Sequence, residues 1–160
     1  MIRLLRLGGD ESGTSVIELA LVAPLLASFL VGMVDLSRAY SFQLGLQQVV
    51  QRSIEKVQQY QESTSTFSTM QNEVVSASQA AGYTDVSATN GSVALDFWLE
   101  CDGVRQADYE SSCSAGQNYA RYVSVSVHSK FTPIFQTSYF PGSNADGTYT
   151  ITSEAGMRTQ

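Results

Sequence analysis

The feature that most constrains this chain is an apolar run near the N-terminus, from Leu19 to Val34. Between Thr14 and Val34 the only ionisable side chain is Glu18, and the sequence turns polar immediately afterwards. A helix of this length extends roughly 30 Å, which matches the hydrocarbon thickness of a bilayer. The run therefore predicts a single transmembrane helix over residues 14–34.

A secretory signal peptide is the competing interpretation, because Arg3 and Arg6 precede the apolar run. The apolar core of such a signal usually has roughly 7 to 15 residues and is followed by a cleavage site. Here the run is longer and continues into polar sequence with a helical period, which favours retention of the segment. Only Arg38 is basic in the stretch just after the run, so the slight charge asymmetry favours a cytoplasmic leader and an exported C-terminal part.

The spacing of Gly13 and Glu18 resembles the processing site of type IV prepilins. The resemblance implies cleavage after Gly13 by a prepilin peptidase, so that Thr14 becomes the first mature residue. It also implies that the new ammonium of Thr14 meets Glu18 of a neighbouring subunit in the assembly. A carboxylate in a membrane helix costs roughly several kcal/mol, and pairing with the ammonium would neutralise its charge.

The finer pattern resembles the TadE-like minor pilins, or pseudopilins, of the tight-adherence (Tad/Flp) type IVc pilus. It consists of Gly13-Thr-Ser-Val-Ile-Glu-Leu-Ala-Leu-Val-Ala-Pro-Leu-Leu with Gly32, Asp35, Arg38 and Ala39 downstream, and the likeness extends over residues 9–55. The alternative for the apolar segment is a plain membrane anchor.

The resemblance implies a protein that serves pilus assembly for surface attachment, cell adhesion and biofilm formation. Its implied partners are the major and minor pilin subunits, the prepilin peptidase and the inner-membrane assembly platform. Its implied location is the inner membrane, as a single-pass protein with a periplasmic C-terminal domain, or an extracellular pilus. The chain then divides into a prepilin leader (1–13), a transmembrane helix (14–34), an amphipathic helical stem (35–61) and an exported domain (62–160).

Charge and length narrow the choice of partners. The chain has 160 residues, a formal net charge of -6 at pH 7 and a pI of about 4.6. No cluster of Lys and Arg is present, which excludes nucleic acid as a partner. The length leaves room for one small domain beyond the membrane helix.

Apolar residues continue at helical spacing after the membrane run and predict an amphipathic stem with one face to bury. They are Leu36, Tyr40, Leu44, Leu46, Val50, Ile54 and Val57. Pro24 removes one backbone donor inside the long helix, so we expect a kink near it. A tolerated proline with no role is an equally good interpretation of Pro24.

A second, shorter helix is expected from about Thr66 to Ala81, ended by Gly82. Beyond it the apolar period changes to two, which predicts strands around residues 93–99, 123–127 and 149–153. Asn90-Gly91 predicts a two-residue hairpin that adds a strand over residues 86–89. The predicted fold class is α+β: a long N-terminal helix, transmembrane in its first half and amphipathic in its second, packed on a four-stranded antiparallel sheet beside a short second helix.

Two cysteines, Cys101 and Cys113, lie in one polar stretch of the exported part, and the simplest expectation is one disulfide. The acidic residues around them suit a solvated loop better than a calcium site, since their spacing lacks the alternating ligands of a calcium loop. These residues are Glu100, Asp102, Asp108 and Glu110. For the same reason Asn144-Ala-Asp146-Gly147 is expected to be a turn.

The sequence contains no arrangement typical of catalysis. His128, the only histidine, lies on the polar side of an alternating strand, where solvation is a better expectation than general-base chemistry. We therefore expect no catalytic residue, no metal and no cofactor, and a non-enzymatic protein. The second hypothesis is a single-pass membrane-anchored periplasmic binding or sensor domain, and an anchored hydrolase is the third.

Overall fold

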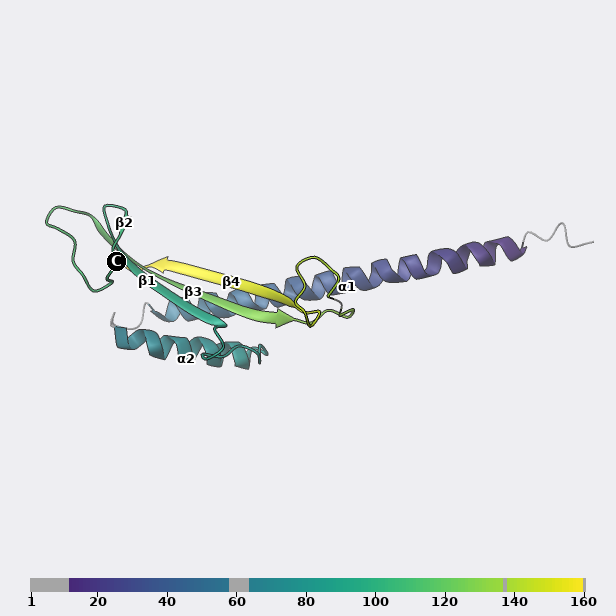
Figure 1. The fold of residues 1–160 in the computed structure, drawn as a ribbon, viewed down its shortest axis with the longest axis horizontal. Coiled ribbons are helices and arrows are strands. Elements are labelled where there is room, and N and C mark those ends of the chain that lie inside the picture. Colours follow the sequence, from purple (N-terminus) through teal and green to yellow (C-terminus); the bar gives the residue numbers. More distant parts are fainter. Residues whose placement is uncertain (1–11, 58–63, 137, 160) are drawn as a thin grey trace, which may run out of the picture. The chain divides into compact units, whose positions relative to one another are not determined.

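The computed structural model describes residues 12–57, 64–136 and 138–159, and the side chains of residues 15–56, 69–136 and 138–159. The described part contains two helices and one antiparallel sheet (Figure 1). The elements are α1 (Ser12–Val57), α2 (Thr64–Ala80), β1 (Val93–Cys101), β2 (Val104–Arg105), β3 (Tyr119–Phe131) and β4 (Tyr149–Arg158). The predicted fold class, α+β with a long N-terminal helix, is confirmed.

The chain divides into two compact units, Met1–Arg38 and Ala39–Gln160, and α1 runs from the first into the second. The second unit holds the sheet, whose strand order is β2-β1-β3-β4. In its register Val93 lies opposite Val127, and Val127 lies opposite Ser153. Odd-numbered residues of all three long strands therefore share one face, and this is the apolar face that the alternation predicts.

One hydrophobic core joins that face to both helices. From α1 it receives Leu46, Val49, Val50 and Ile54, and from α2 it receives Met70 and Val74. Leu46 and Val50 are 0% exposed and Ile54 is 6% exposed. The prediction that these three residues cover the sheet is confirmed, whereas the side chain of Val57 lies outside the described residues.

The predicted burial is wrong for the first three residues of this apolar series, because Leu36, Tyr40 and Leu44 are exposed. Leu44 and Leu46 are two positions apart, which in a helix is about 200° of rotation, so they point to opposite sides. The buried side continues instead through the half-buried Phe42, whose ring contacts that of Phe131 with centroids 5.6 Å apart. The stem is thus packed along one face only.

The predicted hairpin at Asn90-Gly91 is also wrong. No strand is present over residues 86–89, and the segment before β1 forms turns. The Asn90 side chain donates to the carbonyl oxygen of Asp85 at 2.8 Å and accepts from the backbone N–H of Ser92 at 3.0 Å. These bonds fold the segment into a compact loop in place of a strand pair.

The fourth strand is β2, which pairs with the end of β1 through Asp102-Gly103. Both central residues have positive φ, 50° for Asp102 and 79° for Gly103, as a two-residue hairpin with the right-handed twist of the strands requires. Asp-Gly is among the strongest sequence signals for such a turn. The sequence thus contained the correct signal, but it lay at Asp102-Gly103.

Helix α2 ends in a turn that determines where Tyr83 lies. Gly82 adopts φ 101°, the N–H of Gly82 donates to the carbonyl of Gln79 and the N–H of Tyr83 donates to the carbonyl of Ser78, each at 3.0 Å. This pair of bonds is the Schellman arrangement, which needs a residue in the left-handed region. The turn brings Tyr83 back over the helices, where its ring enters the core.

Candidate membrane-spanning and assembly segment

From Leu19 to Val34, α1 carries no charged side chain and is apolar on all sides. The large apolar side chains of this segment are exposed within the first unit, except for the half-buried Val31, and they include Leu21 at 73% and Met33 at 70%. Among the described helices, α1 is the one with a segment long and apolar enough to cross a membrane, by length and composition. Because a helix that is apolar all round needs lipid or other helices around it, this segment indicates membrane anchoring.

Glu18 is the only ionisable residue inside the apolar part of the helix. Its side chain is exposed and makes no ion pair or hydrogen bond with any described residue. Thr14 lies one helical turn before it, on the same face. In the uncut chain the Thr14 nitrogen belongs to a peptide bond, so an ammonium exists there only if the chain is cleaved after Gly13.

The structure places the backbone of Gly13 and Thr14 within the first turn of α1, and their side chains lie outside the described ones. Pro24 lies inside the same helix, which continues on both sides of it. Its ring cannot donate to the carbonyl of Ala20, while nearby the Ser28 hydroxyl donates to the carbonyl of Leu25 at 2.7 Å. Cleavage after Gly13 and the kink at Pro24 stay predictions.

A charged pair marks the end of the apolar segment. The Arg38 guanidinium contacts the Asp35 carboxylate at 3.0 Å, one turn apart on the helix. Side chains of opposite charge at this spacing partly neutralise each other. The pair places the first polar turn of α1 directly after Val34.

The next part of α1 is shaped to receive Tyr83. The Tyr83 hydroxyl donates to the carbonyl oxygen of Phe42 at 2.9 Å, and the Phe42 and Tyr83 rings meet edge to face with centroids 4.8 Å apart. A Cβ added at Gly45 would collide with that hydroxyl oxygen. Burial raises the pKa of Tyr83, so the hydroxyl keeps its proton and remains a donor at neutral pH.

Cys101 and Cys113 form a disulfide with Cα atoms 5.6 Å apart, as predicted. The loop between them is more than a solvated segment, because Tyr109 is 6% exposed and belongs to the core. Its ring packs edge to face on Phe97, with centroids 5.6 Å apart, and the Arg121 guanidinium lies 5.3 Å from its centroid. Sequence reasoning missed Tyr109, although it is the only aromatic residue between the two cysteines.

The acidic side chains around the disulfide serve local hydrogen bonds. Glu100 accepts from the Trp98 indole at 2.8 Å, Asp102 from the N–H of Asn118 at 2.9 Å and Asp108 from the N–H of Glu110 at 3.1 Å. Among the described residues, no three His, Cys, Asp or Glu side chains are grouped closely enough to hold a metal ion. His128 lies on the polar face of the sheet, and its Nδ1 is 2.7 Å from the Thr152 hydroxyl.

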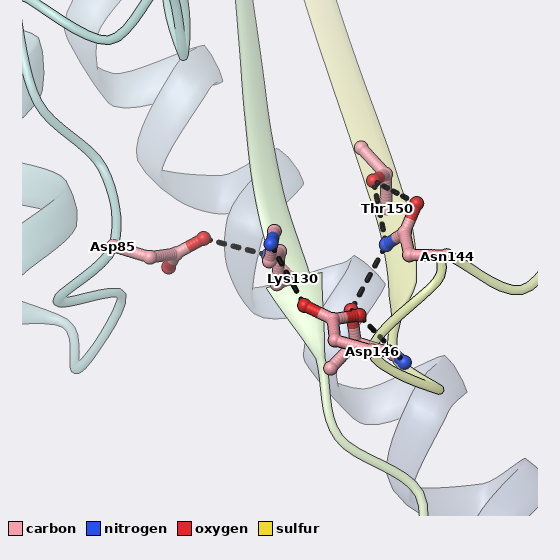
Figure 2. Close-up of polar contacts among 6 residues, drawn as sticks. Asp85, Lys130, Asn144, Asp146 and Thr150 are labelled. Carbon is pink, nitrogen blue, oxygen red and sulfur yellow. Dashed lines mark hydrogen bonds and ion pairs between the residues drawn. The ribbon is translucent and has the colours of Figure 1, made fainter. Parts of the chain in front are cut away.

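The turn near residue 146 is tied to β3 (Figure 2). The Asp146 carboxylate accepts from Thr148 and contacts the Lys130 ammonium at 2.9 Å, which together lower the pKa of Asp146 well below its ordinary value. Gly147 has φ 75° and donates to the Asn144 carbonyl at 2.9 Å, so this segment is the expected turn. On the other side of Lys130, the Asp85 carboxylate accepts a hydrogen bond from the backbone N–H of Lys130 at 2.7 Å.

Comparison with known families identifies the N-terminal part of the chain. Residues 13–54, about a quarter of the sequence, match the family model described as TadE-like protein. Neither the curated proteins nor the solved structures contain a match to this chain. The matched segment begins at Gly13, includes Glu18 and the apolar run, and ends where α1 packs on the sheet. Residues 13–54 of this chain are therefore similar to the TadE-like proteins.

Proposed function

We propose that the protein is a non-enzymatic minor pilin, or pseudopilin, of a tight-adherence pilus. The observation that carries the proposal is the TadE-like match that begins at Gly13 and includes both Glu18 and the apolar helix. In this proposal the precursor sits in the inner membrane with its C-terminal domain in the periplasm. A prepilin peptidase removes residues 1–13, and the mature protein then joins other pilin subunits at the assembly platform.

Glu18 would act through its charge. Cleavage after Gly13 creates an ammonium at Thr14, and that group needs a counter-charge once it enters an apolar helix bundle. Glu18 of a neighbouring subunit would supply it, because neither charge is stable alone in that environment. The pair would also define the axial position of one subunit relative to the next.

The burial pattern of α1 supports different roles for the first and second parts of the helix. Leu46, Val50 and Ile54 are already buried against this chain's own sheet and cannot serve a second helix. Leu21, Met33 and the other exposed apolar side chains between Val16 and Leu36 are available for packing with lipid or pilin helices. The first part of α1 would thus make the assembly contacts, while the second part holds the exported domain.

The mass of the mature protein tests this proposal. Protein extracted from membranes of cells that contain a prepilin peptidase should begin at Thr14, and the same chain made in peptidase-deficient cells should begin at Met1. Gly13→Val is the matched variant, because a side chain at the cleaved position should block processing. Wild-type protein that still begins at Met1 in peptidase-containing cells would exclude the pilin proposal and favour the anchored binding or sensor domain.

A further inference from the structure

Strand β4 forms one edge of the sheet and leaves a row of backbone groups without a strand partner. The N–H of Thr159 donates to the carbonyl of Arg121 at 2.8 Å, which continues the register between β3 and β4. Odd-numbered residues of β4 therefore direct their backbone groups toward β3, since these directions alternate along a strand. Even-numbered residues direct theirs outward.

The outward backbone groups of Thr152, Glu154 and Gly156 are open to a partner strand. Thr152, Glu154 and Gly156 are exposed, and no described residue outside the β3–β4 ladder contributes a hydrogen bond to their backbone N–H or carbonyl groups. β4 contains no proline, and its register with β3 is continuous, without a bulge. It thus lacks two of the usual devices that keep an edge strand from pairing.

The opposite edge of the sheet is protected. There β2 pairs with the end of β1, and the N–H of Gln106 donates to the carbonyl of Leu99 at 2.7 Å. At the other end of β1, the Gln71 side chain from α2 reaches the carbonyl of Val93 at 3.5 Å. Both ends of the β1 edge are therefore covered, whereas no such cover is present among the described residues for the outward backbone groups of Thr152, Glu154 and Gly156 on β4.

The charges on β4 indicate which strand fits this edge. Glu154 and Arg158 carry opposite charges. Glu154 lies two residues before Gly156 and Arg158 lies two residues after it. When two copies of β4 pair antiparallel about Gly156, Glu154 of each copy lies opposite Arg158 of the other. We propose that two copies of this protein join through β4 in this way and form one continuous sheet across the pair.

The backbone directions agree with this register. Pairing about Gly156 matches even-numbered residues with even-numbered residues, so outward groups meet outward groups over Glu154 to Arg158. A pair centred on Glu154 would instead place the two Glu154 carboxylates opposite each other, which is destabilising. Arg158 already donates to the carbonyl of Tyr119 at 3.3 Å, but a guanidinium has five N–H donors and can also bind the partner's carboxylate.

Cross-linking tests the register directly. Opposed residues of a hydrogen-bonded antiparallel pair have Cα atoms about 5.5 Å apart, within the range that a disulfide spans. A Cβ at Gly156 would make an ordinary 3.5 Å contact with Ser124, so Gly156→Cys should fold. The native cysteines are already joined to each other and do not compete. Under mild oxidation of membranes that contain the full chain, Gly156→Cys should give a covalent dimer.

The matched control is Thr150→Cys, which is also exposed on β4. In the proposed register the two copies of residue 150 are roughly 40 Å apart, so this variant should stay monomeric on oxidation. Equal yields of dimer from the two variants, or no dimer from Gly156→Cys, would overturn the proposal. Gly13→Val should leave the cross-link unchanged, because the contact does not depend on cleavage, and this separates it from the proposed function.

Charge reversal gives a second, independent test in the Gly156→Cys background. Glu154→Arg alone, or Arg158→Glu alone, should lower the yield of dimer by roughly tenfold, because like charges then meet at two symmetric places. Co-expression of the two variants with different tags should restore the dimer as a mixed pair, since the charges are complementary again. Yields that do not respond to either reversal, or no mixed dimer on co-expression, would contradict pairing between copies of this chain.

Discussion

The Tyr83 hydroxyl donates a 2.9 Å hydrogen bond to the carbonyl oxygen of Phe42, and it can do so only because residue 45 has no side chain. Three local features produce this contact: the Schellman turn at Gly82, the absence of a Cβ at Gly45 and the edge-to-face packing of Tyr83 on Phe42. Together they attach the C-terminal end of α2 to α1. Phe42 and Gly45 lie within the matched TadE-like segment and Tyr83 lies outside it, so the contact joins that segment to a later part of the second unit.

The first prediction concerns this contact. In an open helix, Gly→Ala stabilises by about 1 kcal/mol, but at Gly45 the new methyl group collides with the Tyr83 hydroxyl, so we expect a net loss of about 1–3 kcal/mol. Tyr83→Phe alone should cost about 1 kcal/mol by removing the hydrogen bond. The double variant should be more stable than Gly45→Ala alone, because the colliding oxygen is gone. Denaturant unfolding of the purified protein measures all three.

Gly32→Ala is the matched control for this cycle, since a Cβ there meets no atom within 4 Å. It should leave the unfolding of the second unit unchanged. Strictly additive effects of Gly45→Ala and Tyr83→Phe would show that the two residues are not coupled in solution.

The second prediction concerns Glu18 and rests on the proposed function. Glu18→Gln keeps the shape of the side chain and removes its charge, so cleavage and membrane insertion should be largely preserved while assembly fails. The measurement is recovery of the processed variant with partner pilins, compared with wild type at equal membrane levels. If Glu18 only destabilises a plain anchor helix in the bilayer, the change should be neutral or should improve retention in the membrane. Undiminished recovery of the variant with partner pilins would show that the carboxylate does not dock this subunit.

The third prediction concerns the disulfide between Cys101 and Cys113. Removing it with Cys101→Ser should lower the free energy of unfolding by roughly 3 kcal/mol, from the loop entropy of the unfolded chain, and reduce steady-state abundance without affecting insertion. Adding Cys113→Ser should cost nothing further, because the bond is already lost. Alkylation and mass spectrometry of the exported wild-type protein should find no free thiol, and two free thiols would refute the pairing.

The fourth prediction concerns the pH dependence of the turn at Asp146. Its pKa is lowered below the ordinary value of 3.8 by the hydrogen bonds from Thr148 and by the nearby Lys130 ammonium. Because the pKa of this carboxyl is lower in the folded state than in the unfolded chain, its contribution to stability is fully present at pH values above the pKa of the unfolded chain. That contribution is lost as the pH falls through the lower pKa of the folded state. The Thr148 amide signal in NMR should therefore titrate only in strong acid. A midpoint at or above the ordinary value would contradict the ion pair, and Asp146→Asn should abolish the titration.

Much of this protein could be predicted from the sequence because the decisive features are local. The apolar run with Glu18, the change of period from helix to strand and the stop at Gly82 each depend on neighbouring residues alone. The disulfide could be predicted because only two cysteines are present and they lie in one stretch. The TadE-like resemblance rested on the same local features, namely Gly13, Glu18, Pro24 and the run that contains them, and the family match confirms it.

The tertiary structure decided what depends on partners distant in the sequence. Asn90-Gly91 has the composition of a hairpin, yet the preceding segment is held by Asp85, which accepts from the Ser129 hydroxyl at 2.6 Å, so no strand forms there. Tyr109 is buried because Phe97 and Arg121 receive its ring, and nothing near it in the sequence indicates that. Local periodicity determines which elements form, whereas the fit between their surfaces determines which strands pair and which side chains are buried.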